Sequence, residues 1–180
     1  MKIRLTVVML VTSGLTVFSG NIFSEYKAEP CDIEFKGLHK CNLKQGDLSM
    51  SAELVTRKLA DDEKLLESIT ITRNGIKHQL KISPDTTFLE GDIGYISFDD
   101  INFDGIPDAA ITTSFGTPNL YLDYWVYVTK AKHYKKIGNY SRFKLDPVSK
   151  TVSTITKINA ANYKKVRYKW NKYDLITTSR

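Results

Sequence analysis

The residues best suited to chemistry lie in one stretch, DDINFDGIPD, which spans residues 99–108 and holds four aspartates and one asparagine. Counted from Asp100, side chains with oxygen stand at positions 1, 3, 5 and 9, and a glycine stands at position 6. Calcium takes about six to eight oxygen ligands, and a loop that alternates ligands with other residues can wrap the ion if a glycine makes the turn. The spacing predicts a calcium site formed by the carbonyl oxygen of Ile106 and by the side chains of Asp100, Asn102, Asp104 and Asp108.

Three features of this stretch bear on whether an ion binds, on which ion it is, and on the type of loop that holds it. Carboxylates at close quarters repel one another unless a cation lies between them. Magnesium rarely uses so many protein ligands, which favours calcium. Position 12, where an EF-hand has a bidentate glutamate, is Ile111, and the flanking segments have strand patterns, so the loop is not an EF-hand. The alternative is a polar turn without a metal.

Strand patterns surround the loop and run through most of the chain. SITITRNGIKHQLKI alternates apolar and polar residues on both sides of Asn74-Gly75, a dipeptide typical of tight hairpins. YLDYWVYV, residues 121–128, is rich in aromatic and β-branched residues. Residues 57–69 are dense in helix formers, but their pattern fits a charged hairpin equally well. We expect an all-β fold, either a twisted antiparallel sheet or a propeller-like domain, with the calcium loop between strands.

Residues 1–20 have the layout of a secretory signal peptide. Two basic residues precede an uncharged, mostly apolar stretch over residues 5–18, and small residues follow it. The stretch is short for a membrane-spanning helix, which needs about 20 residues, although an uncleaved anchor remains the alternative. We expect cleavage between residues 19 and 24, a periplasmic location, and a single all-β domain over residues 21–180 without stable membrane insertion.

Two cysteines, Cys31 and Cys41, follow the predicted cleavage region. In an oxidising compartment such a pair most often forms a disulfide, whereas in a reducing cytosol both would be free thiols. Because export is predicted, we expect the disulfide. The chain has no third cysteine and no nearby pair of histidines, so a structural zinc site has little support.

Charge is distributed unevenly along the chain. Residues 85–127 contain eight acidic side chains and no lysine or arginine, whereas residues 128–180 contain fourteen basic side chains and two acidic ones. Such a basic segment is typical of a solvated face of strands, and the alternative is a surface that attracts an acidic partner. Nucleic acid is not expected as that partner, because the chain is predicted to be exported.

The segments FDDINFDGIPDAAI, YLDYWVYV and YKKVRYKWNKYDLI, between about residues 90 and 175, carry a resemblance to known proteins. The first resembles the calcium loops between strands of integrin-type propeller repeats. Together the three resemble bacterial periplasmic immunity proteins, which neutralise peptidoglycan hydrolases delivered by antibacterial type IV secretion systems. The fold of that family is similar to periplasmic inhibitors of invertebrate-type lysozyme. The resemblance implies an all-β domain, a bound calcium ion and inhibition by a protruding loop.

The resemblance also implies a Gly-x-x-Tyr pattern in the inhibitory loop. The segment SFGTPNLY, after the calcium loop, places Gly116 and Tyr121 five positions apart, so the pattern is not strictly present. The predicted partner-binding residues are Gly116, Tyr121 and Tyr124, with Tyr121 as the side chain inserted into the hydrolase. The alternative is that Tyr121 begins the aromatic strand and packs on the sheet.

No catalytic residue is predicted. The three histidines are scattered, and the sequence lacks serine nucleophile elbows, phosphate-binding glycine loops and paired-histidine zinc motifs. We therefore expect a calcium-binding inhibitor of a peptidoglycan hydrolase or lysozyme-like protein, not an enzyme. The alternative function is a calcium-stabilised module that binds glycan or another envelope component without inhibitory activity.

Overall fold

In the computed structural model, which describes residues 31–34, 41–114 and 119–179, every regular element is a strand. The strands are β1 (Cys31–Glu34), β2 (Cys41–Gln45), β3 (Leu48–Lys58), β4 (Glu63–Arg73), β5 (Ile76–Leu80), β6 (Thr87–Leu89), β7 (Ile93–Ser97), β8 (Ala109–Ser114), β9 (Tyr121–Val128), β10 (His133–Ser141), β11 (Lys144–Asp146), β12 (Thr151–Lys157), β13 (Tyr163–Asn171) and β14 (Asp174–Ser179). All strand pairs are antiparallel, and the sheets of the described residues do not close into a barrel. The predicted all-β fold is confirmed, whereas the predicted signal peptide lies outside the described residues.

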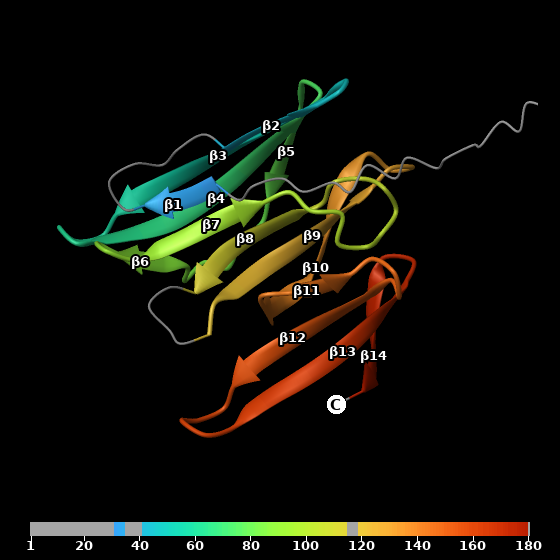
Figure 1. Cartoon of the computed structure of the whole chain (residues 1–180). Helices are drawn as coiled ribbons and strands as arrows, with labels where there is room; N and C mark the ends of the chain where they lie inside the picture. Colours follow the sequence, from blue (N-terminus) through green and yellow to red (C-terminus); the bar gives the residue numbers. More distant parts are fainter. Residues whose placement is uncertain (1–30, 35–40, 115–118, 180) are drawn as a thin grey trace, which may run out of the picture.

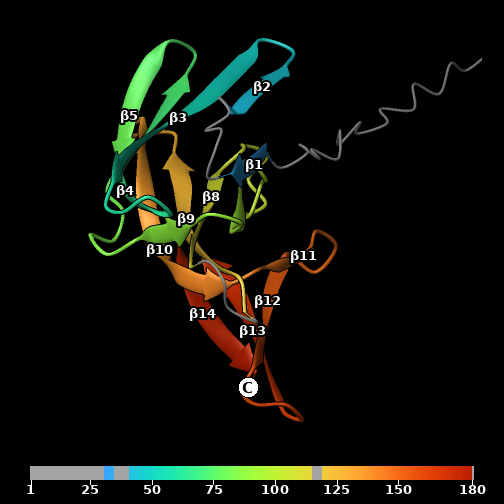
Figure 2. The same ribbon diagram turned by 90° about the vertical axis from the view of Figure 1, so that its left-hand side faces the viewer.

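Three sheets lie one above another along the molecule (Figure 1, Figure 2). The N-terminal sheet has the strand order β2-β3-β4-β5, with β6 paired to β4. The central sheet has the order β1-β7-β8-β9-β10, and the C-terminal sheet has the order β11-β12-β13-β14. Because the central sheet is covered on both faces, its middle strands β8 and β9 are buried almost throughout.

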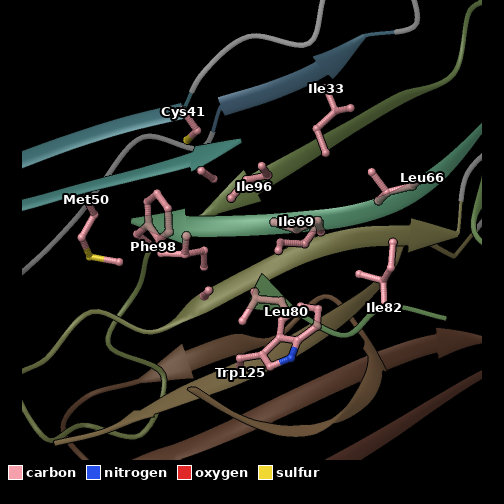
Figure 3. Close-up of a cluster of buried hydrophobic side chains, with 14 residues drawn as sticks. Ile33, Cys41, Met50, Leu66, Ile69, Leu80, Ile82, Ile96, Phe98 and Trp125 are labelled. Atoms are coloured by element: carbon pink, nitrogen blue, oxygen red, sulfur yellow. The ribbon is translucent and has the colours of Figure 1, made fainter. Parts of the chain in front are cut away.

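A first hydrophobic core fills the space between the N-terminal and central sheets (Figure 3). The N-terminal sheet contributes Met50, Ile69 and Ile71, and the central sheet contributes Ile96, Ile111 and Trp125. Along β3 and β4 these buried side chains alternate with more exposed ones, which is the period of two expected for a strand with one covered face.

A second hydrophobic core lies between the central and C-terminal sheets. The side chains of Leu122, Tyr124 and Val126 point into it from β9, and Val152 meets them from β12. Strand β9 therefore supplies alternate residues to both cores, since Trp125 belongs to the first. A strand with two covered faces needs few polar side chains, which explains the composition of YLDYWVYV.

Residues 57–69 form no helix. They belong to the hairpin of β3 and β4, in which Lys58 pairs with Lys64 across the turn, so the hairpin alternative is confirmed. The long ladder between these strands and the burial of Leu66 outweigh the local helix propensity. The hairpin predicted at Asn74-Gly75 is also confirmed, and both residues have the positive φ angles, 47° and 81°, that its tight turn requires.

The predicted disulfide between Cys31 and Cys41 is confirmed. It joins β1 of the central sheet to β2 of the N-terminal sheet, with the two Cα atoms 5.5 Å apart. Cys41 is buried in the first core, and Cys31 packs against that core. The bond therefore links an edge strand of the central sheet to an edge strand of the N-terminal sheet.

We expect the double variant Cys31→Ser/Cys41→Ser to lose about 2.7 kcal/mol of unfolding free energy, because the unfolded chain regains the entropy of the closed loop. The sequence separation of the two cysteines is 10. Urea unfolding of the variant and of the oxidised wild type measures the difference. Reducing the wild type should have the same effect, and a variant as stable as the oxidised protein would contradict the prediction.

Candidate metal centre

The predicted calcium loop, residues 98–108, connects the neighbouring strands β7 and β8 of the central sheet. The amide of Asp108 donates a hydrogen bond of 2.9 Å to the carbonyl oxygen of Asp99, which closes the loop at its base. Gly105, at the predicted turn position, has a φ of +83°, a left-handed conformation that glycine adopts without strain. The backbone therefore makes the sharp turn that the spacing predicted.

Backbone amides hold two of the predicted ligands in place. The carboxylate of Asp100 accepts hydrogen bonds from the amides of Asp104 and Gly105, at 3.0 and 2.8 Å. The carboxylate of Asp104 accepts one from the amide of Ile106 at 3.0 Å and another from the Asn102 side chain at 3.0 Å. Each carboxylate has about four lone-pair positions, so these bonds leave acceptor capacity for a cation.

Asp108 is the most unusual of the predicted ligands because its side chain is 0% exposed. Its two oxygens accept hydrogen bonds from the amides of Tyr127, at 2.8 Å, and Ile101, at 3.1 Å. No lysine, arginine or histidine of the described segments forms an ion pair with it. Burial raises the pKa of Asp108 well above its usual range, and the nearby charges of Asp104 and Asp100 raise it further.

The donors of the loop fit calcium in their chemistry. They are hard oxygens of carboxylate, amide and carbonyl groups, which calcium prefers. Burial also raises the pKa of Asp100, so two carboxylates of the loop are less stable as anions than exposed ones would be. Within the described residues, however, no three acidic, histidine or cysteine side chains stand close enough together to form a ready metal cluster. Binding an ion would therefore draw the carboxylates of Asp100, Asp104 and Asp108 closer together.

Arg73 is a neighbour of the loop that the sequence did not reveal. Its guanidinium Nη1 donates a hydrogen bond of 3.0 Å to the carbonyl oxygen of Pro107, and the group lies 4.2 Å from the centre of the Tyr127 ring. Arg73 ends β4 of the N-terminal sheet, 34 residues before Pro107. No local pattern could predict this contact, because only the stacking of the two sheets brings the residues together.

The predicted partner-binding loop is separated from the calcium loop by the length of a hairpin. Strands β8 and β9 pair so that Ala109 lies opposite Trp125 and Ser114 lies opposite Tyr121. The calcium loop joins β8 at the open end of this hairpin, and Tyr121 lies at the other end. The two ends are about 20 Å apart, because β8 has six residues. Gly116 lies outside the described residues.

The structure places the two predicted tyrosines in different environments. Tyr121 is half-buried at the start of β9, and its side chain keeps exposed surface. Tyr124 is 3% exposed, and its ring stacks on Phe143 with the ring centres 4.0 Å apart. The assignment of Tyr124 to a partner surface is therefore corrected, because its position on β9 points the ring into the second core.

A pocket with a volume of about 390 Å³ lies where the end of β5 meets β9 and β10. Its lining includes two aromatic residues, Trp125 and Tyr134, and two lysines, Lys81 and Lys136. Lys136 also forms an ion pair with Asp123, a buried residue of β9, at 2.5 Å. Sequence reasoning missed this pocket because its residues come from separate segments and share no motif.

Comparisons of the chain with protein-family models, with curated proteins and with solved structures find no match. In the part of the chain that the structure describes, no helix is long and apolar enough to cross a membrane.

Proposed function

We propose that this protein is exported to the periplasm, binds calcium in the loop of residues 98–108, and inhibits a peptidoglycan hydrolase of the lysozyme type. In this role it acts as an immunity protein. The proposal combines the resemblance in sequence with the geometry of the loop and of the hairpin that follows it. It involves no catalytic residue of the chain itself.

The observation that carries the proposal is the hydrogen bond of 2.8 Å from the Tyr127 amide to the Asp108 carboxylate. It connects the candidate calcium loop directly to β9, the strand that begins with Tyr121. An ion bound by Asp108 would restrain β9 and the hairpin of β8 and β9. A restrained hairpin loses less conformational entropy when it docks on a partner.

Tyr121 is the residue of this hairpin that suits an inhibitor. A lysozyme-type hydrolase carries catalytic carboxylates in a cleft that binds sugar rings. A tyrosine can donate its hydroxyl proton to such a carboxylate while its ring occupies the space of a sugar. The exposed part of Tyr121 makes this insertion possible without unfolding the central sheet.

Inhibition is tested by adding the purified chain, with calcium, to a panel of lysozyme-type hydrolases that includes any hydrolase encoded beside its gene. The release of soluble fragments from purified peptidoglycan measures their activity. We expect inhibition at equimolar amounts, and we expect Tyr121→Ala to weaken it by about 10-fold or more while its melting temperature falls by only about 2 to 4 °C.

Ile76→Ala is the control, because Ile76 is a 50% exposed side chain on β5 of the N-terminal sheet, beside the turn at Asn74-Gly75. It should inhibit as the wild type does. A folded wild type that inhibits no hydrolase of the panel would contradict the proposal, as would equal inhibition by both variants and the wild type.

The second candidate function, glycan binding without inhibition, is favoured by the pocket beside Trp125 and Tyr134. Aromatic rings with nearby polar groups are a common arrangement in ligand pockets. Retention of the chain on purified peptidoglycan in the absence of a hydrolase, together with its loss in Lys81→Ala, would support this function instead.

A further inference from the structure

We propose that the outer face of the C-terminal sheet docks on an anionic phospholipid surface. The inner face of this sheet packs on the second core through Val152, Tyr168 and Leu175. The opposite face carries a set of cations and exposed apolar side chains, which we call the outer basic face. The proposal is independent of calcium and of hydrolase inhibition.

Strand register places the members of this face. Residues directly opposite each other in an antiparallel pair lie on the same side of the sheet. Lys165 lies opposite Ile155, Lys169 lies opposite Ile176, and Lys157 lies opposite Tyr163. Arg167 lies opposite Ser153, which in turn lies opposite Lys144 of β11. The outer basic face therefore contains five cations: Lys144, Lys157, Lys165, Arg167 and Lys169.

Acidic side chains on this face do little to neutralise the cations. Asp174 lies at the edge of the sheet and pairs with Lys135 of β10 at 2.7 Å. Asp146, opposite Thr151 on this face, accepts a hydrogen bond of 3.1 Å from the amide of Ser149. Hydrogen bonds from Ser149 and the charge of Arg167 lower the pKa of Asp146, so it offsets one of the five cations. The face keeps a net positive charge, so it complements an anionic surface.

Large apolar side chains are interleaved with these cations. Ile155, Tyr163 and Ile176 are 52%, 62% and 51% exposed, and each stands opposite one of the lysines. Lysine and arginine stems can also cover apolar surface while their charged ends stay in water. The combination of apolar groups and charges within one face is typical of surfaces that lie at a membrane interface.

A lipid surface fits this face better than a soluble polyanion does. A hydrated polyanion would pair with the cations but leave both isoleucines in water. An anionic bilayer attracts the lysines through its surface potential and also accepts the apolar side chains between them. The cations come from three neighbouring strands, β11, β12 and β13, so they present a broad face and not a single ridge.

The test measures cosedimentation of the purified chain with phosphatidylcholine vesicles, with and without phosphatidylglycerol, in a chelator that removes calcium. We expect binding to the anionic vesicles alone. The triple variant Lys165→Gln/Arg167→Gln/Lys169→Gln should bind them on the order of 100-fold more weakly, because each cation near such a surface contributes about 5-fold.

A matched control removes three cations from the opposite end of the molecule. Lys44, Lys77 and Lys81 are exposed and lie on β2, on β5 and just after β5. Their triple glutamine variant loses the same net charge, but it should weaken vesicle binding by less than about 3-fold, because these lysines lie far from the docked face. The pair Ile155→Ser/Ile176→Ser should reduce the binding that persists at high salt.

Two results would overturn the proposal. One is a folded wild type that does not sediment with anionic vesicles. The other is equal loss of binding in the outer-face variant and the control variant, which would mean that net charge alone is responsible. In a wild type that does not bind vesicles, the outer-face variant can still lose affinity for an acidic protein such as a hydrolase. That pair of results would make the face a protein-binding surface instead.

Discussion

Calcium at about 1,000 times its dissociation constant is expected to raise the free energy of unfolding by about 4 kcal/mol, because the ion binds the folded loop and not the unfolded chain. For a chain of this length the melting temperature should rise by roughly 8 to 16 °C. The physical reason lies in the loop, where the buried carboxylate of Asp108 and the carboxylates of Asp100 and Asp104 lack a compensating cation among the described residues.

Asp104→Asn tests this prediction at one ligand. The substitution removes a negative charge, but the asparagine oxygen can still accept the hydrogen bond that the Ile106 amide gives to Asp104. Asp104 is exposed, so the fold of the metal-free protein should survive. We expect most of the calcium-dependent rise in melting temperature to disappear.

Asp92→Asn is the matched control. Asp92 is a half-buried aspartate that accepts a hydrogen bond of 2.8 Å from the amide of Leu89 in a turn outside the calcium loop. This variant should respond to calcium as the wild type does. Thermal unfolding of the three proteins, in calcium and in chelator, gives the comparison. An unchanged melting temperature of the wild type after chelation would mean that the loop is a polar turn without a metal.

Tyr124→Ala is expected to lower the free energy of unfolding by about 3 to 5 kcal/mol, because it removes a large ring from a closely packed core. The ring stacks on Phe143, and the tyrosine hydroxyl accepts a hydrogen bond of 2.9 Å from the Phe143 amide. Burial also raises the pKa of Tyr124, as expected for a phenol that lies away from water.

Two further variants separate the parts of this effect. Tyr124→Phe keeps the ring but leaves the buried amide of Phe143 without its acceptor, at a cost of about 1 to 3 kcal/mol. Tyr121→Ala, at a half-buried position on the same strand, should cost about 1 kcal/mol. Urea unfolding measures all three. A Tyr124→Ala variant as stable as Tyr121→Ala would place Tyr124 outside the core and restore it as a partner-binding candidate.

Local features of the structure followed directly from the sequence. The Asn74-Gly75 hairpin formed as predicted because the two residues accept positive φ angles that most residues avoid. Gly105 turns the loop for the same reason. The disulfide could also be predicted, since the two cysteines of a chain with the pattern of a signal peptide have only each other as partners in an oxidising compartment.

The burial of single residues could not be predicted in the same way. The alternation along β9 correctly separates Tyr124 from Tyr121, but it does not say that both faces of the strand are covered. Residues 57–69 have a composition suited to a helix, but they form a hairpin because β4 pairs with β3 over most of its length. In both cases the deciding contacts come from residues distant in the chain.

The sequence by itself determined several strands, the turn at Asn74-Gly75, the pairing of Cys31 with Cys41 and the order of oxygen donors from Asp100 to Asp108, because these depend on near neighbours along the chain. Tertiary structure alone decided that three sheets stack, that Asp108 is buried under Tyr127, and that five cations share the outer basic face. The physical reason is that burial and the grouping of charges depend on which faces meet. Apolar alternation shows that a strand has a face to cover, but it does not identify the layer that covers it.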